Sequence, residues 1–506
     1  MQGVAEQTLR KGLRDDDKRR GWRGPTKNIL KNPLTKTDGT PVTLETYLDD
    51  DWKKPLTAGD LVHGLVTDVK PDHAVVRFGS LNARVTAPDF AWIKKTPLTE
   101  VFASGDVDLF EVKEVKGTTV HVSLDQNPDV EGALLAIDNS TGEIKALVGG
   151  YDWTVSKYDR AIQAERQVGS SFKVYVYAQA ILDGISPFDT VLDAPVSYHT
   201  SSGWWSPHNY DEKFEGTITV LHALAESRNV PAVRTLGKIG VDKVIKLSRK
   251  FGITSRLVPN LPLALGASDL TLLEHTSAFT TFPNDGVHIT PRMVTRVTNY
   301  DGRVMDDFPA EVTDVLPASA SRIMVSMLRE VFNSGTAERG KPFAAKYPVA
   351  GKTGTTNDFT DAWFLGFSPS LTCGVYVGFD DHRTLGEKEE GARVALPIWL
   401  DFMGEVLKDR PVEDFPRSPL LTNPDQVKEI LASAAPERLL APAPAAPATA
   451  AVTLHAPQIA APAPTPDIPK KEAATPKPPA NPPAATPPNT PSGPVAKGPA
   501  PSSGKP

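Results

Sequence analysis

Three short motifs follow one another along the chain and carry side chains that could transfer an acyl group through a serine. They are Ser170-Ser171-Phe172-Lys173, Ser227-Arg228-Asn229 and Lys352-Thr353-Gly354-Thr355. A serine and a lysine three residues apart on a helix lie on one face, about 5–6 Å apart between their Cβ atoms. At that separation an amine can take the hydroxyl proton, so Ser170 is the candidate nucleophile and Lys173 its base.

Each motif is weak when it is taken alone. A second S-x-x-K, Ser502–Lys505, lies in a Pro-rich segment that cannot hold a helix face, and a second S-x-N lies at Ser80–Asn82. Lys352-Thr353-Gly354 is the only K-T-G in the chain. The order of the motifs and their surroundings therefore carry the argument.

The segment that follows Ser170 is apolar on almost every side and predicts a core helix that ends at Asp183-Gly184. Its N-terminal turn would hold Ser170 at the edge of a cleft and direct backbone N–H groups at a reacting carbonyl oxygen. Burial disfavours the charged form of Lys173, and a second cation at Lys352 would lower its pKa further. The plainer alternatives are a helix cap at Ser170 and an ordinary ion-paired lysine at Lys173.

The second motif lies where a helical stretch, Leu221–Glu226, meets Val230-Pro231, and it predicts a turn into a new helix with Pro231 at the first position. The Ser227 hydroxyl could relay a proton between Lys173 and a leaving amine. The Asn229 carboxamide could hold an amide of the substrate. Without the other motifs, this one would be only a cap.

The third motif predicts a strand that lines the cleft, with Gly354 admitting the substrate backbone. Lys352 and the hydroxyls of Thr353 and Thr355 suit a terminal carboxylate. The backbone N–H groups of Ser170 and Thr355 could form an oxyanion hole. A phosphate-binding loop is excluded because the G-x-x-x-x-G-K-[ST] spacing is missing.

The elements that must position these residues divide the chain. Residues 1–57 predict a helical connector, and 58–127 contain five short period-two segments, for which a small OB-like β-barrel is the leading candidate. The barrel alternates Asp, Glu and Lys and has few aromatic residues, which favours an interaction or spacer module over a reader of nucleic acid.

Residues 128–412 begin with a strand hairpin, continue with helical segments from about 160 to 340, and return to apolar strands at 347–379. This order predicts an α/β sandwich, an antiparallel sheet with helices, whose sheet brings the two ends of the segment together. Residues 413–433 form a short C-terminal segment. Residues 434–506 are rich in Ala and Pro, and we expect them to be disordered.

Composition excludes several classes of protein. The 506 residues carry a formal net charge of −6, which argues against a nucleic-acid partner bound through bulk charge. The single cysteine excludes a disulfide within the chain and most cysteine-based metal sites. No run of about 18 apolar residues and no apolar signal-peptide core are present, so we expect no membrane span or export signal in this chain. We expect neither a cofactor nor a metal.

Residues from about 130 to 410 strongly resemble the transpeptidase domain of class A penicillin-binding proteins, which have the penicillin-binding/β-lactamase-like fold. The resemblance rests on Arg166–Lys173, Ala225–Val233, Leu263–Ala267, Ile289–Pro291, Lys352–Asp358 and Asp361–Phe364. The OB-like segment resembles an insert found in one branch of these enzymes, and the opening helix resembles the connector after their glycosyltransferase domain. Acidic glycosyltransferase motifs and a membrane anchor are missing upstream, so we expect no glycan polymerisation from this chain.

The resemblance implies that the penultimate D-Ala of a peptidoglycan stem peptide acylates Ser170 and that the terminal D-Ala is released. The acyl group then passes to an amine of a neighbouring stem or to water, and β-lactams trap the same serine. The resemblance also implies a location in the periplasm or on the outer face of the cytoplasmic membrane. It implies partners in cell-wall synthesis, reached through the OB-like module, and a Trp204–Asp211 loop beside the groove.

Three alternatives stay open: a D,D-carboxypeptidase, a β-lactamase, and a β-lactam sensor or non-catalytic scaffold of the same fold. A β-lactamase needs a positioned carboxylate to activate the deacylating water, and no segment indicates one. Slow release of bound penicillin would favour the transpeptidase. Intact Ser170, Lys173 and Lys352 argue against a decayed site but not against a sensor.

Overall fold

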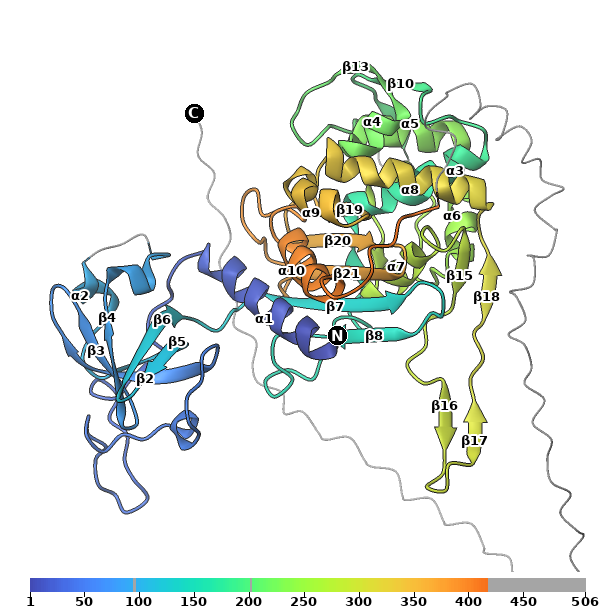
Figure 1. The fold of residues 1–506 in the computed structure, drawn as a ribbon. Coiled ribbons are helices and arrows are strands. Elements are labelled where there is room, and N and C mark those ends of the chain that lie inside the picture. The colour runs from blue at the N-terminus through green and yellow to red at the C-terminus, as the bar shows by residue number, and fades with distance from the viewer. Residues whose placement is uncertain (94–96, 201–202, 417–506) are drawn as a thin grey trace, which may run out of the picture. The chain divides into compact units, whose positions relative to one another are not determined.

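Hydrophobic side chains gather in separate cores in the computed structural model, which describes residues 1–93, 97–200 and 203–416 (Figure 1). One core lies in a small barrel and the largest lies around a five-stranded sheet. The predicted tail, 434–506, and most of the predicted segment 413–433 lie outside the described residues. Among the residues that are described, no helix combines the length and the apolar composition needed to cross a membrane.

The barrel closes through five strands in the order β2-β3-β4-β6-β5, with β5 pairing back to β2. The five predicted strands are confirmed: β2 (Leu61–Val69), β3 (Ala74–Phe78), β4 (Leu81–Val85), β5 (Asp106–Lys116) and β6 (Thr119–Asp125). The short elements around them are β1 (Lys27–Asn28), η1 (Asp50–Lys53), η2 (Ala87–Phe90) and α2 (Leu98–Val101). Alternate residues of β3 are buried, because every second side chain points into the barrel. Assignment of this closed barrel to the OB-fold remains a prediction.

The main sheet joins strands from both ends of the predicted α/β sandwich, as the sequence pattern indicates. Its order is β19-β20-β21-β7-β8, and every pairing is antiparallel. The strands are β7 (Glu131–Asp138), β8 (Ile144–Val148), β19 (Ala350–Thr355), β20 (Asp361–Phe367) and β21 (Leu371–Gly378). Every residue of β20 and β21 is buried, which explains their continuous apolar composition, because helices cover both faces.

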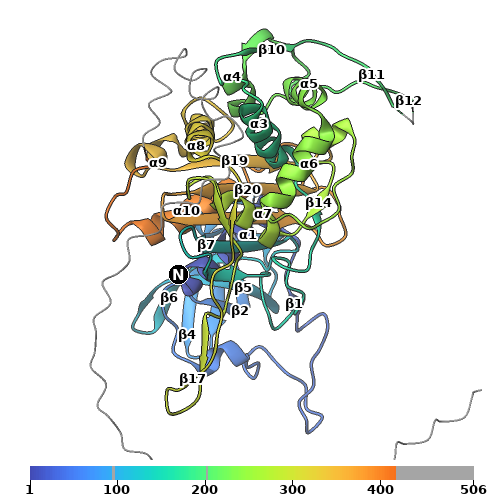
Figure 2. The same cartoon turned by 90° about the vertical axis from the view of Figure 1, so that its right-hand side faces the viewer.

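Helices α1 (Gln2–Lys18) and α10 (Ala395–Leu407) pack together on one face of this sheet, and α7 (Leu272–Thr280) packs on the other (Figures 1 and 2). Ala5, Leu9 and Leu13 recur at a helical spacing and join the sheet's core. Ile29 and Tyr47 instead pack against barrel strands. The segment predicted as a 1–57 connector is thus shared between two hydrophobic cores.

A group of helices lies beyond the β19 edge of the sheet, as Figure 1 shows. It contains α3 (Lys173–Leu182), α4 (Val220–Ala225), α5 (Asn229–Ile239), α6 (Val241–Lys250), α8 (Ala318–Asn333) and α9 (Lys341–Lys346), with the short turns η4 (Leu261–Leu265) and η5 (Glu338–Gly340). All but the last residue of α3 are buried, as its apolar composition predicts. The three motifs meet where this group contacts β19.

Short two-stranded sheets also occur between 160 and 340, where only helices were expected. They are β9–β14 (Arg166–Gln167, Asp269–Leu270), β10–β13 (Thr190–Asp193, Gly216–Thr219), β11–β12 (Tyr198–Thr200, Gly203–Trp205), β15–β18 (Val287–Ile289, Val312–Asp314) and β16–β17 (Arg296–Thr298, Val304–Asp307). Strands of two to four residues are too short to display a period of two in the sequence.

Candidate active site

Ser170 lies in a 3₁₀ turn, η3 (Gly169–Phe172), and not in the α-helix that the sequence predicts around it. The α-helix α3 begins only at Lys173 and ends at Leu182, where the predicted stop at Asp183-Gly184 is confirmed. In a 3₁₀ turn, residues three apart are eclipsed, so Ser170 and Lys173 still share one side. Ser170 is partly exposed, whereas Lys173 is fully buried.

The turn that carries Ser170 packs directly against the third motif on β19. Gly169 has φ +56°, and a Cβ there would overlap the carbonyl oxygen of Thr355. A Cβ at Gly354 would lie 2.5 Å from the carbonyl oxygen of Val168. Packing within the protein therefore requires a residue without a side chain at position 354. The contact of Gly354 with the substrate backbone remains a prediction.

Within the described part of the chain, all hydrogen bonds of the Lys173 side chain are with the second motif. Its Nζ donates to the carbonyl oxygen of Ser227 at 2.5 Å and to Asn229 Oδ1 at 2.6 Å, and it lies 3.2 Å from Ser227 Oγ. Burial lowers the pKa of Lys173 well below its ordinary value, and the positive charges of Lys352 and Arg228 lower it further. A neutral amine has two N–H donors and one lone pair. The two carbonyl oxygens occupy the donors and leave the lone pair for a hydroxyl.

Lys352 approaches the same serine from β19. Its Nζ donates to Ser227 Oγ at 2.9 Å and lies 3.2 Å from the carbonyl oxygen and 3.4 Å from Oγ1 of Thr353. Lys352 is fully buried, and burial lowers its pKa to about 7, although the negative charge of Glu226 opposes this shift. The Thr353 hydroxyl is held by Thr336, 2.7 Å away between the two Oγ1 atoms.

Ser227 has φ +57°, a left-handed conformation that is uncommon for a residue with a side chain. The following helix, α5, begins at Asn229, so Pro231 is its third residue. The prediction of Pro231 at the first position was therefore wrong by two residues. A proline is tolerated at either place because N–H groups of the first turn have no partner within the helix.

A loop that precedes the second motif holds it in place. Asn209 Oδ1 accepts hydrogen bonds from the backbone N–H groups of Asn229 at 2.8 Å and Val230 at 3.2 Å. The carboxamide of Asn229 donates to the carbonyl oxygen of His208 at 2.9 Å. Both Oδ1 and one N–H of Asn229 are thus used within the protein, and one N–H is left for its predicted contact with a substrate amide.

Arg228, the middle residue of the motif, is 7% exposed and forms ion pairs with Asp193 and Asp211, each at 3.0 Å. Neither carboxylate, nor Asn209, was identified as a site residue from the sequence. The only signal was the predicted position of the Trp204–Asp211 loop beside the groove. Tyr210 of that loop contacts the ring of Phe359, which follows β19, with centroids 5.9 Å apart.

Thr355 lies at the end of β19, beside the turn of Ser170. Its Oγ1 accepts a hydrogen bond from the backbone N–H of Gly391 at 3.1 Å, and its hydrogen stays free to donate to a substrate. Because Gly169 lies against Thr355, the backbone N–H groups of Ser170 and Thr355 belong to adjoining segments. The predicted oxyanion hole is compatible with this arrangement.

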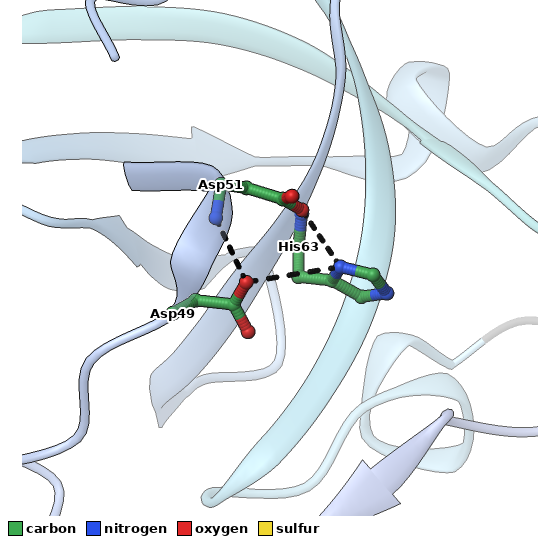
Figure 3. Close-up of side chains that lie close together, drawn as sticks. All are labelled: Asp49, Asp51 and His63. Atoms are coloured by element: carbon green, nitrogen blue, oxygen red, sulfur yellow. Dashed lines mark hydrogen bonds and ion pairs between the residues drawn. The ribbon is translucent and has the colours of Figure 1, made fainter. Parts of the chain in front are cut away.

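A separate cluster on the barrel offers atoms that could hold a cation, as Figure 3 shows. Asp49, Asp51 and His63 present two oxygens and a nitrogen that all lie within 4.8 Å of one another. His63 Nδ1 is hydrogen-bonded to Asp51 Oδ2 at 2.8 Å, and Asp49 accepts from the backbone N–H of Asp51 at 3.2 Å and from the Tyr47 hydroxyl at 2.6 Å. These bonds account for the cluster as a link between η1 and β2, and we assign no metal to it.

Comparison with known proteins identifies the domain that contains the three motifs. Residues 132–403 match the family model described as the penicillin binding protein transpeptidase domain. Penicillin-binding protein 1A of Aquifex aeolicus is 42% identical over 294 residues, which are 58% of this chain and 40% of that protein. Penicillin-binding protein 1A of Rickettsia bellii is 33% identical over 444 residues, which are 81% of this chain and 53% of that protein. The chain thus spans about half the length of these relatives.

Solved structures agree with the sequence comparison. The crystal structure of penicillin-binding protein 1A from Haemophilus influenzae has a TM-score of 0.71 at 25% identity and covers 83% of this chain and 66% of that one. The PonA1 protein from Mycobacterium tuberculosis, in complex with penicillin V, has a TM-score of 0.51 at 25% identity and covers 58% and 82%. The predicted resemblance is confirmed: the chain belongs to the penicillin-binding protein transpeptidase family.

Proposed function

We propose that this chain is a serine D,D-transpeptidase that cross-links peptidoglycan stem peptides and that penicillin acylates at Ser170. The observation that carries the proposal is the arrangement of two buried lysines around one hydroxyl. Lys173 and Lys352 lie 3.2 and 2.9 Å from Ser227 Oγ, and the Ser170 turn precedes Lys173 directly. This arrangement supplies a neutral base and a cation within one site.

In the acylation step, the lone pair of Lys173 takes the proton of the Ser170 hydroxyl. Ser170 Oγ bonds to the carbonyl carbon of the penultimate D-Ala, and the backbone N–H groups of Ser170 and Thr355 stabilise the developing oxyanion. The amide bond to the terminal D-Ala then breaks. The leaving amine receives a proton from the Lys173 ammonium through the Ser227 hydroxyl, so D-Ala departs and an ester remains on Ser170.

In the second step, an amine of a neighbouring stem attacks the ester and loses a proton to the lysine–serine pair, while Ser170 regains its hydrogen. Lys352 and the hydroxyls of Thr353 and Thr355 would bind the terminal carboxylate before the first step. Because β19 is an edge strand of the main sheet, an extended peptide can pair with its free edge. A β-lactam would enter the same first step through its cyclic amide.

The proposal places the reaction where stem peptides occur, in the periplasm or on the outer face of the cytoplasmic membrane. It includes other cell-wall synthesis proteins as partners of the barrel and does not include glycan polymerisation. A carboxypeptidase differs from it only in using water as the acceptor. A β-lactamase differs in releasing the penicilloyl group rapidly.

The proposal is tested by incubating the chain with a fluorescent penicillin and locating the adduct by peptide mass spectrometry. We expect a long-lived adduct on Ser170, no adduct in Ser170→Ala, and an unchanged adduct in Ser80→Ala, which alters the other S-x-N sequence. With a stem pentapeptide and an amine acceptor, D-Ala release should accompany formation of a cross-linked dimer. Absence of the adduct would refute the acylation, and rapid penicillin turnover would identify a β-lactamase.

A further inference from the structure

A buried histidine outside the three motifs contacts the nucleophile's turn. His275 is on α7 and is fully buried. Its Nε2 lies 2.7 Å from the hydroxyl oxygen of Ser171, the residue after the candidate nucleophile, and its Nδ1 lies 2.8 Å from the Tyr175 hydroxyl. Rings of Phe279 and Trp363 pack edge-on against the imidazole, with centroids 5.2 and 5.9 Å away.

The directions of the two hydrogen bonds of His275 follow from the bond between the Ser171 hydroxyl and a carbonyl oxygen, which can only accept. The Ser171 hydroxyl donates its only hydrogen to the carbonyl oxygen of Val168 at 2.7 Å, so it must accept from His275. His275 therefore carries its hydrogen on Nε2, and Nδ1 accepts from the Tyr175 hydroxyl. Burial lowers the pKa of His275 to about 3, which keeps the ring neutral and preserves this single arrangement at physiological pH.

We propose that His275 is a positioning residue for the nucleophile: through Ser171 it fixes the Val168 carbonyl and thus the turn that presents Ser170. This inference rests on the proposed function. The Val168 carbonyl oxygen is also the atom that would contact a Cβ at Gly354, 2.5 Å away. It is thus held between the Ser171 hydroxyl and β19, one peptide unit before Gly169, whose positive φ makes this a sharp change of chain direction.

A series of hydrogen-bonded polar groups, here called the relay, crosses an otherwise apolar core, and the positioning role accounts for it. The relay consists of Tyr175, His275, Ser171 and the Val168 carbonyl: each ring nitrogen has one hydroxyl partner, and the Ser171 hydroxyl both accepts from His275 and donates to Val168. Removing the imidazole would leave two buried hydroxyls with unfilled hydrogen bonds. The turn could then rotate, and the Ser170 hydroxyl and N–H would lose their orientation relative to Lys173 and Thr355.

The matched control is a second buried histidine, His288, which lies on β15 and contacts the same helix, α7. His288 Nε2 lies 2.8 Å from the Ser277 hydroxyl of α7, and burial lowers the pKa of His288 to about 4. His288→Leu removes a buried histidine–serine hydrogen bond, as His275→Leu does, but it does not touch the turn of Ser170.

The experiment measures penicillin acylation of the full chain by stopped flow and separates the first-order acylation constant from the dissociation constant of the non-covalent complex. We expect His275→Leu to lower the acylation constant about 10- to 100-fold, because small misplacements of a nucleophile are costly, with a nearly unchanged dissociation constant. His275→Gln, which can donate and accept in the same places, should restore the constant to within about threefold. Tyr175→Phe keeps the histidine and tests the relay by a milder change, with a smaller loss.

All variants are measured below their unfolding temperatures, and His288→Leu should acylate at the wild-type rate. Equal losses in the two leucine variants, or wild-type acylation in His275→Leu, would overturn the positioning role while leaving the proposed function intact. A wild-type chain that penicillin does not acylate would instead overturn the proposed function. Independently, ¹⁵N NMR of the imidazole should show hydrogen on Nε2 and no titration down to pH 5; hydrogen on Nδ1 would refute the relay.

Discussion

Lys173 and Lys352 lie within hydrogen-bond distance of the same oxygen, Ser227 Oγ, at 3.2 and 2.9 Å. One amine comes from the start of a buried helix and the other from the edge strand of the main sheet. Two fully buried amines this close cannot both keep a positive charge at neutral pH without a large electrostatic cost. The pKa of each is lowered, and that of Lys173 is lowered further by the charge of Lys352.

Replacing Lys352 by methionine should change the pH dependence of acylation. In the proposed mechanism acylation requires neutral Lys173, so the acylation rate should rise with pH through the Lys173 pKa. Without the charge of Lys352 that pKa rises, and the acidic limb of the rate moves to higher pH. We expect kcat/KM for a carboxylate substrate to fall about 10- to 100-fold as well, because a charge-assisted hydrogen bond is lost. Lys352→Arg keeps the charge and should leave the limb in place; a limb that moves to lower pH in Lys352→Met would contradict the assignment.

Replacing Glu226 by glutamine should move the alkaline limb of the pH–rate profile, where activity falls as the pH rises, to lower pH. In the proposed mechanism Lys352 must be protonated to bind the substrate carboxylate, and its pKa of about 7 predicts that kcat/KM falls as the pH rises through that value. The Glu226 carboxylate raises this pKa, so its removal lowers the pKa and makes the fall begin at lower pH. The measurement is the pH profile of acylation by a penicillin. The control Glu311→Gln alters an exposed carboxylate that precedes β18 and should leave the profile unchanged.

Gly169→Ala should damage both the stability and the chemistry of the site. Its Cβ would overlap the Thr355 carbonyl oxygen, and the φ of +56° is unfavourable for alanine. Gly302→Ala separates the two effects, since Gly302 has φ +78° and no atom of the described residues lies within 4 Å of the added Cβ. We expect Gly302→Ala to cost about 1–2 kcal/mol of backbone strain and to acylate normally. Gly169→Ala should unfold at a clearly lower temperature and acylate at least about 10-fold more slowly. Similar acylation rates in the two variants would argue against a tight contact between η3 and β19.

Asp108→Asn should stabilise the barrel at neutral and alkaline pH. Asp108 lies on β5, fully buried, and neither carboxylate oxygen has a hydrogen-bond partner among the described residues. Burial raises the pKa of Asp108 well above its ordinary value, and the nearby charge of Asp106 raises it further. A raised carboxyl pKa gives full stability below the unfolded-state pKa near 4 and progressive loss as the pH rises toward the folded-state pKa.

Asparagine cannot ionise, so the variant should lack this loss and gain roughly 1–3 kcal/mol at pH 8. Hydrogen exchange of the β5 amides between pH 5 and 8, corrected for intrinsic exchange rates, measures the difference. Asp68→Asn, an exposed carboxylate on β2, is the control and should show no gain. Wild-type stability that is independent of pH would show that Asp108 has a partner or water that lowers its pKa.

The amino-acid sequence by itself determined the secondary-structure elements that have a local hydrophobic pattern. It also determined the three motifs that carry the candidate site residues. Five period-two segments predicted the barrel strands, and the residues after Lys173, apolar on every side, predicted a buried helix. Strands at both ends of the 128–412 segment predicted one sheet. These features are readable because burial imposes a periodic pattern on neighbouring residues.

Only the tertiary structure decided how the residues meet. The 3₁₀ turn at Ser170 packs against β19, and α5 begins at Asn229, where Asn209 from the preceding loop, 20 residues upstream, accepts hydrogen bonds from the first N–H groups. The contact of His275 with Ser171 joins residues 104 positions apart. Such contacts leave no periodic trace in the sequence, because they depend on which helix faces which strand edge. The motifs therefore indicate which reaction to propose. The packing of helices against β19 sets the protonation states of Lys173 and Lys352 and the orientation of Ser170, on which the proposed reaction depends.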